Sequence, residues 1–402
     1  MYKNRKILDV LMKHSETKEA IVVTGFRRVG KTMLLRHIYD GVNTNNKVFL
    51  DMESPVNQRA FAADNYDNIK AFLGRLGIDF SKRAFVFLDE IQSVRNLPSV
   101  VKYLYDHNEI KFYLTGSSSF YLKNWFSESM SGRKFLFELY PLDFEEFLAF
   151  KETRLKPTAG HELLSALYEE YLVYGGFPGV ALANSAEEKL LRLDDILGSY
   201  FKLDVQTLAN FRDNQKLKDL LFLLSSRVGS KPEISKLAES LGVSRQTVYE
   251  YLDFFEQTYL IHYLRPVSGS KDVQVKNMPK IYFGDTGILN RIAQVSRGQL
   301  FENKVFNQLF TRLSYESKSA ELRDNIGYYQ KKSGAEIDFI VEGKTAFEVK
   351  TVGGRFDVRR LQRIASKLGI ANCHVVSLDK VEKELAEIIY PYDLASTPKL
   401  SN

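Results

Sequence analysis

At 402 residues the chain is longer than one ordinary hydrophobic core requires, so two or three domains are expected. Its composition, 44% hydrophobic and 26% charged, is that of a soluble globular protein, and its net charge of +6 is compatible with an acidic partner such as nucleic acid. The single cysteine, Cys373, excludes an internal disulfide framework and a cysteine-built zinc site, which fits the reducing cytosol.

The first motif along the chain is a glycine-rich loop between an apolar run and a helix-forming run. No signal peptide is expected before it, because Asp9 interrupts the short apolar stretch at the amino terminus. Residues 20–24 are apolar, and residues 25–32 read Gly-Phe-Arg-Arg-Val-Gly-Lys-Thr. This order of strand, loop and helix matches the phosphate-binding pattern GxxxxGK[ST] in its expected context. We therefore predict that the loop binds ATP.

Each residue type in this loop has a physical role. Gly25 and Gly30 let the backbone curl, so that successive N–H groups point at phosphate oxygens. Lys31 supplies a point charge to the β and γ phosphates, Thr32 offers a hydroxyl to Mg²⁺, and the helix that opens here turns its positive end towards the anion. At least one of Arg27 and Arg28 should face phosphate or an acidic partner. The predicted ATP-binding residues are Gly25, Arg28, Val29, Gly30, Lys31, Thr32 and Met33.

Over roughly the first 140 residues, short apolar runs alternate with amphipathic stretches. This rhythm is typical of an α/β fold, a parallel sheet covered by helices. The expected strands are residues 20–24, 47–51, 84–88, 112–115 and 134–138.

Residues 84–90, Ala-Phe-Val-Phe-Leu-Asp-Glu, form a buried strand that ends in two carboxylates, as a Walker B element does. We predict that Asp89 and Thr32 hold Mg²⁺ and that Glu90 polarises the attacking water. Acidic pairs also close strands by chance, but a preceding phosphate-binding loop favours the ATPase interpretation.

Two further residues complete the predicted catalytic set of Lys31, Glu90, Ser117 and Arg133. Ser117 and Ser118 follow a strand at the carboxyl edge of the sheet, where ligands of open α/β sheets bind, so we expect one of the two to contact the γ-phosphate. A plain serine-rich turn is the alternative. Arg133 precedes the last strand, and its guanidinium is a candidate to stabilise the transferring phosphate within its own subunit or from a neighbouring one. An ordinary surface arginine is the alternative.

Together these motifs resemble the prokaryotic AAA-family ATP-binding proteins with a C-terminal domain of unknown function. The resemblance covers almost the whole chain and implies an AAA-like core, a winged-helix middle and a tail related to PD-(D/E)xK nucleases. Two residues depart from the family pattern: Phe26 stands where a proline or small residue is frequent, and Gly284 replaces a bulky apolar residue. The runs that carry the resemblance are residues 25–32, 88–92, 115–118, 132–133, 140–147, 171–178 and 280–287.

The fold class we expect is α/β, with an AAA-like P-loop parallel sheet, then a helical and winged-helix region, then a small α/β restriction-endonuclease-like domain. Residues 141–210 look mostly helical, and the nearly apolar stretch 171–183 contains three glycines and a proline and is too short to span a membrane. Disorder is expected from about Ser396. The expected domains are an ATPase core (1–150), a helical lid or linker (151–210), a winged helix (211–270) and a nuclease-like domain (271–395).

Residues 234–252 have the spacing of a helix-turn-helix inside a compact helical module of residues 217–269. Ala238 is small where two helices meet, Gly242 makes the turn, and Ser244 caps the second helix. If this module reads DNA, the contacts come from Arg245, Gln246 and Tyr249 near the start of that helix. Three acidic residues further along the helix would repel phosphates, so DNA contact and purely structural use both remain open.

An acidic constellation near the carboxyl terminus resembles the PD-(D/E)xK nuclease arrangement. Asp338 lies on one expected strand, Glu348 and Lys350 lie on the same face of the next, and Glu302 lies on the preceding helix 299–309. In nucleases such carboxylates bind Mg²⁺ and the lysine stabilises the attacking hydroxide or developing phosphate charge. Chance patterning on an amphipathic strand is the alternative, and a nuclease-like fold without cutting activity is a second one.

The helix expected at residues 357–368 has an apolar face and a basic face that includes Arg359. A basic face beside a nuclease-like site suits a phosphate backbone, although it also suits ordinary solubility.

We interpret the chain as a cytoplasmic, Mg²⁺-dependent ATP-binding protein and slow ATPase, in which ATP and Mg²⁺ are the cofactors and no membrane is a partner. In one hypothesis it is a nucleotide-driven switch acting on DNA. In the other it is an ATP-regulated protein-interaction module with a catalytically inactive nuclease-like scaffold. A protein partner or a homo-oligomer is compatible with both.

Overall fold

The computed structural model describes residues 2–63, 65–116, 130–152, 160–205, 214–267, 278–316, 325–331, 333–381 and 385–394. The chain forms two compact units. The first consists of Met1–Tyr140, Gly198–Asn210 and Gln257–Tyr259, and the second of Pro141–Leu197, Phe211–Glu256 and Leu260–Asn402. Two short segments from later in the chain therefore return to the unit that the amino-terminal residues form, which the sequence did not predict. The expected disorder from Ser396 lies outside the described residues.

The first unit is built on a five-stranded sheet with the order β2-β3-β4-β1-β5. Every neighbouring pair is parallel, which confirms the predicted parallel sheet. β1, β2 and β5 also have the predicted bounds. The strands are β1 (Ala20–Thr24), β2 (Lys47–Asp51), β3 (Ala84–Asp89), β4 (Ile110–Gly116) and β5 (Lys134–Glu138).

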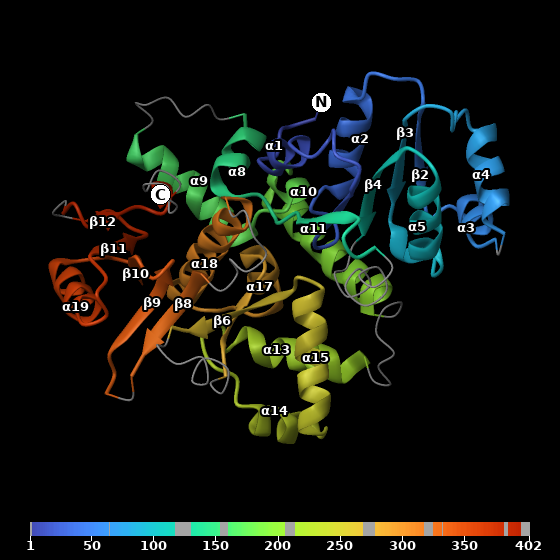
Figure 1. Cartoon of the computed structure of the whole chain (residues 1–402). Coiled ribbons are helices and arrows are strands. Elements are labelled where there is room, and N and C mark those ends of the chain that lie inside the picture. The colour runs from blue at the N-terminus through green and yellow to red at the C-terminus, as the bar shows by residue number, and fades with distance from the viewer. Residues whose placement is uncertain are drawn as a thin grey trace. The chain divides into compact units, whose positions relative to one another are not determined.

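Helices cover both faces of this sheet (Figure 1). Because side chains alternate between the faces of a strand, neighbouring residues of β3 enter different layers. Val86 belongs to the same buried core as Val100 of α5, whereas Phe87 packs edge-on against Tyr39 of α2, with ring centroids 5.3 Å apart. The helices are α1 (Ile7–Met12), α2 (Lys31–Gly41), α3 (Pro55–Phe61), α4 (Tyr66–Arg75) and α5 (Leu97–His107).

The second unit begins with helices, as the sequence predicted for residues 141–210. They are α8 (Phe144–Phe150), α9 (His161–Tyr174), α10 (Pro178–Ala181) and α11 (Ala186–Ser199). A π-helical segment, Tyr200–Val205, continues α11 and belongs to the first unit. In the described part of the chain, no helix combines the length and apolar character needed to cross a bilayer.

The helix-turn-helix elements follow where the sequence placed them. α13 (Asn214–Ser225) precedes α14 (Ile234–Leu241) and α15 (Arg245–Gln257). Gly242 ends α14 with a left-handed φ of 65°, and the Ser244 hydroxyl oxygen accepts a hydrogen bond of 3.0 Å from the Thr247 N–H. The end of the expected helical module is instead a strand, β6 (Ile261–Pro266), because its backbone pairs into a sheet formed by later residues.

That second sheet has seven strands in the order β12-β11-β10-β9-β8-β6-β7. The expected hairpin that carries the acidic constellation is present, since β9 and β10 pair antiparallel. α19 packs on β9, β10 and β11, as Figure 1 shows at the red end of the chain. The other elements are β7 (Lys280–Phe283), α17 (Thr286–Ile292), α18 (Arg297–Glu316), β8 (Ile326–Gln330), β9 (Glu336–Val341), β10 (Thr345–Lys350), α19 (Arg355–Ser366), β11 (Asn372–Ser377) and β12 (Ile388–Ile389).

The glycine-rich signatures at 171–178 and 280–287 meet in one buried junction of the second unit. Asp285 accepts hydrogen bonds from the N–H groups of Gly176 (2.7 Å) and Gly287 (2.8 Å). Gly175 has a φ of 78°, and a Cβ there would lie 2.0 Å from the Asp285 carboxylate. These signatures therefore fasten α9 to α17, which is a structural role.

Candidate functional site

The glycine-rich loop joins β1 to α2 at the carboxyl edge of the parallel sheet. Gly25 has a φ of 150°, and a Cβ at this position would lie 2.1 Å from the Leu139 carbonyl oxygen, so only glycine fits. Arg28 and Gly30 have φ values of 66° and 102°, which curl the loop back on itself. α2 begins at Lys31, so the positive end of the helix opens onto the loop.

Lys31 is buried beneath this loop. Its Nζ donates hydrogen bonds to the carbonyl oxygens of Gly25 (2.9 Å) and Phe26 (3.0 Å). Burial lowers the pKa of Lys31, and the negative charge of Glu90 opposes that shift. Anionic phosphate oxygens would be stronger acceptors than the two carbonyl oxygens, so the ammonium group is placed to exchange them for a phosphate.

Asp89 and Thr32 form an oxygen-rich pair beside Lys31. The Asp89 carboxylate accepts a hydrogen bond from the Thr115 hydroxyl on β4. Burial raises the pKa of Asp89, and the nearby hydroxyls of Thr115 and of Thr32 on α2 lower it. Carboxylate and hydroxyl oxygens are the ligands that Mg²⁺ prefers, so Thr32 and Asp89 fit the predicted metal. Sequence reasoning missed Thr115, because its contact with Asp89 forms only when β3 and β4 pair.

Glu90 follows directly and has an unusual backbone conformation. Its φ of 54° and ψ of 51° place a non-glycine residue in the left-handed region, and such strain concentrates at functional sites. Its N–H donates to the Thr115 hydroxyl oxygen at 3.2 Å, and its carboxylate accepts a hydrogen bond from the Gln92 amide. This arrangement fixes a carboxylate beside the Asp89 and Lys31 pair, and the role of Glu90 as the base that activates water stays a prediction.

The loop is also held by a segment that lies far away in the sequence. Arg27 Nε donates to the buried Asp204 carboxylate at 2.9 Å, and the Phe26 ring stacks on Tyr200 with centroids 5.4 Å apart. Burial lowers the pKa of Arg27, but the charge and hydrogen bond of Asp204, together with the charges of Glu90 and Glu53, outweigh that effect and raise the pKa. The sequence predicted an acidic partner for Arg27 or Arg28, and Asp204 is that partner for Arg27. Stacking on Tyr200 accounts for the aromatic residue Phe26, which departs from the family pattern.

A second distant segment, just after α15, contacts the same region. Tyr200 and Thr258 share a hydrogen bond of 2.8 Å between their hydroxyl oxygens. The Tyr259 hydroxyl lies 3.3 Å from the Thr24 hydroxyl and 3.1 Å from the Glu138 carboxylate. Thr24 is the last residue of β1, immediately before Gly25. The sequence carried no local pattern for these contacts, because their partners are separated by more than fifty residues.

Arg133 lies at the opposite edge of the sheet from the loop. Its carbonyl oxygen accepts the Ala20 N–H at the start of β1 (2.8 Å), and its guanidinium pairs with Asp106 at 2.8 Å. The five residues of β1 separate it from the loop by about 16 Å. The interpretation that Arg133 contacts phosphate in its own subunit is therefore wrong; its role towards a neighbouring subunit stays a prediction. Ser117 lies outside the described residues, and its role also stays a prediction.

The predicted acidic constellation gathers in the second unit. Asp338 accepts a hydrogen bond from the Val349 N–H (2.8 Å), and Glu302 accepts one from the Tyr282 hydroxyl (2.6 Å). Burial raises the pKa of Glu302 to about 7, and the Asp338 charge adds to that shift. Lys280, which sequence reasoning missed, is buried here and pairs with Glu336 at 2.8 Å.

Cations of the chain itself neutralise much of this cluster. Glu348 Oε1 accepts hydrogen bonds from Lys350 (2.7 Å) and Arg360 (3.2 Å). Burial and the Asp338 charge both raise the pKa of Glu348, and these cations oppose the shift. Across the residues that the structure describes, no three His, Cys, Asp or Glu side chains are grouped to hold a metal ion. Glu348 and Lys350 therefore form an ion pair that Arg360 joins, and the use of Glu302, Asp338, Glu348 and Lys350 as a nuclease-like site stays a prediction.

We expect Glu302→Gln to stabilise the protein at pH 8 by about 2–3 kcal/mol and to change little at pH 5. The folded pKa of about 7 exceeds the ordinary value of 4.5, so the native carboxyl retains a proton and the free energy of unfolding falls as pH rises between these values. Glutamine removes the charge and still accepts the Tyr282 hydrogen bond. Denaturant unfolding at both pH values, with EDTA, measures the difference.

The control for this measurement is Glu316→Gln on the same helix, where the carboxylate is exposed and no gain at pH 8 is expected. Equal stabilities of wild type and Glu302→Gln at pH 8 would contradict the expectation. Stabilisation of the wild type by Mg²⁺ at pH 8, lost in Glu302→Gln, would instead identify a metal site.

The candidate DNA-contacting side chains are on the surface. Arg245, Gln246 and Tyr249 are exposed along the first turns of α15, and Arg359 is exposed on α19. Gln246 also donates to Glu250 of the same helix at 3.3 Å. DNA contact at all four residues stays a prediction.

Comparison with known families divides the chain into three matched regions. Residues 17–148 match the model described as AAA domain. Residues 165–299 and 297–395 match two models, each described as a domain of unknown function (DUF8612 and DUF4143). The AAA-type core and the C-terminal domains of unknown function are thus confirmed, and the AAA-type P-loop fold supports nucleotide binding. The winged-helix and nuclease-like descriptions go beyond these matches.

The relatives of the chain are uncharacterized prokaryotic proteins. One from Methanocaldococcus jannaschii is 27% identical over 371 residues, which is 88% of this chain and 80% of that protein. One from Haemophilus influenzae is 27% identical over 368 residues, which is 89% and 88% of the two chains. Among solved structures, Aeropyrum pernix Orc1 in complex with DNA is 13% identical with a TM-score of 0.35, over 73% of this chain and 92% of that chain.

Proposed function

We propose that this chain, with its AAA domain at residues 17–148, is a Mg²⁺-dependent, slow ATPase of the cytoplasm that acts as a nucleotide-driven switch on DNA. The observation that carries the proposal is the double attachment of the phosphate-binding loop. Asp204 and Tyr200 hold Arg27 and Phe26, while Tyr259 contacts the last residue of β1. Both attached segments are continuous in the chain with helices of the second unit, α11 and α15.

The chemistry follows from the side chains around the loop. Lys31 would pair with the β and γ phosphates, and the N–H groups of the curled loop would bind the remaining phosphate oxygens. Thr32 and Asp89 would hold Mg²⁺, which neutralises phosphate charge when bound. Glu90 would then orient and deprotonate the attacking water.

The switch arises because the loop cannot change its conformation without affecting the segments that are bonded to it. Phosphate charge arriving beside Arg27 competes with Asp204 for the guanidinium, so the ion pair has different strengths with and without nucleotide. Asp204 lies in a π-helical turn, an irregularity that often marks functional sites in helices. Since Tyr200 is also bonded to Thr258, a shift of this turn reaches the residues that follow α15.

We expect Asp204→Asn to bind ATP within about tenfold of wild type but to lose the response of α15 to nucleotide. Asparagine keeps the shape and removes the charge that holds Arg27, which leaves Lys31 and the loop backbone in place. Hydrogen exchange of residues 245–260, with and without Mg²⁺ and ATPγS, measures the response. In the wild type it should slow several-fold on binding.

The matched control is Asp194→Asn on α11, which breaks an exposed pair with Arg291 of 2.6 Å. Exposed pairs contribute about 0–1 kcal/mol, so this variant should keep the wild-type response. An Asp204→Asn protein whose α15 still responds as in wild type would show that this ion pair does not carry the switch.

A second candidate function is an ATP-regulated protein-interaction module. It is favoured by the neutralised acidic cluster and by the carboxylates of Glu250 and Asp253 on the exposed face of α15, which repel phosphates. DNA binding that weakens steeply with rising salt supports the first function. An absence of DNA binding at low salt leaves the second.

A further inference from the structure

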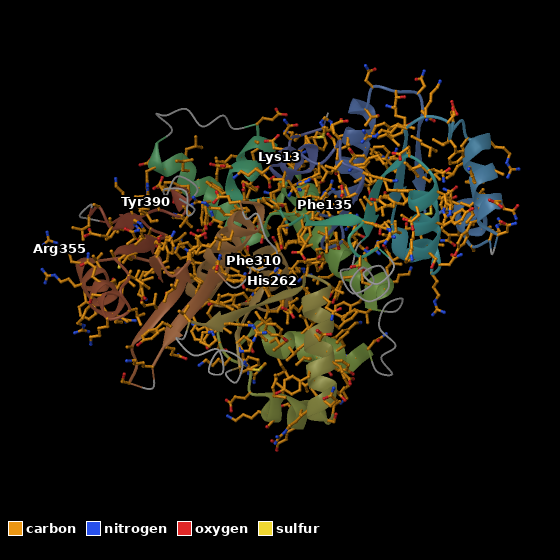
Figure 2. The ribbon with its side chains drawn as sticks, in the orientation of Figure 1. Lys13, Phe135, His262, Phe310, Arg355 and Tyr390 are labelled. Atoms are coloured by element: carbon orange, nitrogen blue, oxygen red, sulfur yellow. The ribbon has the colours of Figure 1, made fainter. Side chains whose placement is uncertain are left out.

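One exposed face of α19 combines apolar and cationic side chains. Phe356 is 76% exposed and Val352, just before the helix, is 60% exposed. Arg355, Arg359 and Arg363 are exposed beside them. Figure 2 shows Arg355 at the outer edge of α19 with its side chain directed away from the ribbon. We call Val352, Arg355, Phe356, Arg359 and Arg363 the α19 face.

The α19 face belongs to a helix that is packed against the buried core of the second unit. Residues 356, 359 and 363 recur at helical spacing, so they share one side of the helix. Val358, Leu361 and Ile364 form the opposite side and belong to the buried core of the second unit. The turn before the helix is fixed as well, since the Gly353 N–H donates to the Ser377 hydroxyl at 2.9 Å.

The arginines of the α19 face form no ion pair with the described residues. Among the described residues, Arg355, Arg359 and Arg363 have no carboxylate within 4.0 Å, although other exposed arginines of the same unit do. Those paired arginines are Arg192, Arg291 and Arg297. Three guanidinium groups without a carboxylate partner therefore lie on the same face as an exposed phenyl ring.

We propose that the α19 face binds single-stranded DNA, an inference that rests on DNA being the partner in the proposed function. Unpaired bases offer flat rings that stack on Phe356, and the backbone phosphates pair with the three arginines. Duplex DNA would satisfy the arginines but keeps its base faces stacked away from the ring. An acidic peptide would likewise satisfy the charges and leave the aromatic ring without a matching group.

The test is fluorescence anisotropy of the full chain with labelled oligothymidine, across a series of salt concentrations. Phe356→Ala should bind about tenfold more weakly, and Phe356→Trp should restore binding. The matched control is Phe222→Ala on α13, where the ring is 59% exposed, and it should bind as wild type does. Arg359→Ala should reduce the salt dependence by about one phosphate contact.

The outcomes separate this inference from the proposed function. Equal binding by Phe356→Ala, Phe222→Ala and wild type overturns the α19 face and leaves DNA binding standing. Tighter binding to a duplex of the same length, or to polyglutamate, overturns it as well. An absence of oligothymidine and duplex binding by the wild type at low salt overturns both the inference and the DNA part of the proposed function, whereas ATP binding is measured independently.

Discussion

Replacing Lys31 with methionine should weaken ATP binding by about 100-fold or more, because its buried ammonium group lies directly under the loop. Methionine preserves the length and apolar stem of the side chain, so the loss isolates the charge. Isothermal titration with Mg²⁺ and ATP, supported by a thermal unfolding curve, measures both affinity and folding. A variant that is folded and binds ATP normally would overturn the nucleotide-binding assignment.

Lys111→Met provides the matched control for this experiment. Lys111 is also a buried lysine of the first unit, and its Nζ donates to the carbonyl oxygens of His14, Thr17 and Glu19 at 2.6–2.9 Å. It sits on β4 near the amino edge of the sheet, away from the loop. We expect this substitution to lower stability, because it leaves three carbonyl oxygens without their donor, and to leave ATP affinity unchanged.

Replacing Glu90 with glutamine should reduce ATP hydrolysis by at least about 100-fold while ATP binding persists. Glutamine keeps the shape at this strained position but accepts no proton from water, so the chemical step is lost and the ground-state contacts remain. Phosphate release under saturating ATP gives the rate, and titration gives the affinity. Loss of both together would indicate that the substitution disturbs the loop.

Glu53→Gln is the control for the Glu90 substitution. Glu53 is a neighbouring carboxylate whose side chain is 53% exposed, 4.0 Å from Arg27. Its removal should change the hydrolysis rate by less than about tenfold, since an exposed, loosely paired charge contributes little. A loss as large as that of Glu90→Gln would mean that the base is not Glu90 alone.

The local patterns of the sequence predicted much of the first unit. The strands of this parallel sheet are short runs rich in apolar residues, so β1, β2 and β5 could be bounded from residue order, although only β1 of these three is buried along its whole length. The loop and the two carboxylates after β3 were predictable for a similar reason, because the chemistry of phosphate and Mg²⁺ requires neighbouring residues at fixed spacing. The strands β9 and β10, which carry Asp338, Glu348 and Lys350, were also predictable, and residues two apart on a strand share a face.

Contacts between residues that are distant in the sequence could not be predicted from these local patterns. Arg133 has an arginine-before-strand pattern that suggested a role at the phosphate, but parallel pairing with β1 carries it to the other edge of the sheet. Similarly, the sequence placed the Glu348 carboxylate beside Lys350. Only the packing of α19 brought Arg360 to the same carboxylate as a second cation. Strand direction and helix packing decide such placements, and neither is written in the local pattern.

The sequence by itself determined that this chain has a loop for nucleotide phosphate, a parallel sheet behind it and later elements of helix-turn-helix and mixed α/β type. Only the tertiary structure decided what holds that loop: Asp204 on Arg27, Tyr200 on Phe26 and Tyr259 at the end of β1. The reason is physical. A binding loop is specified by residues that are adjacent in the chain, whereas the charge and stacking partners that link it to other segments need only be adjacent in space.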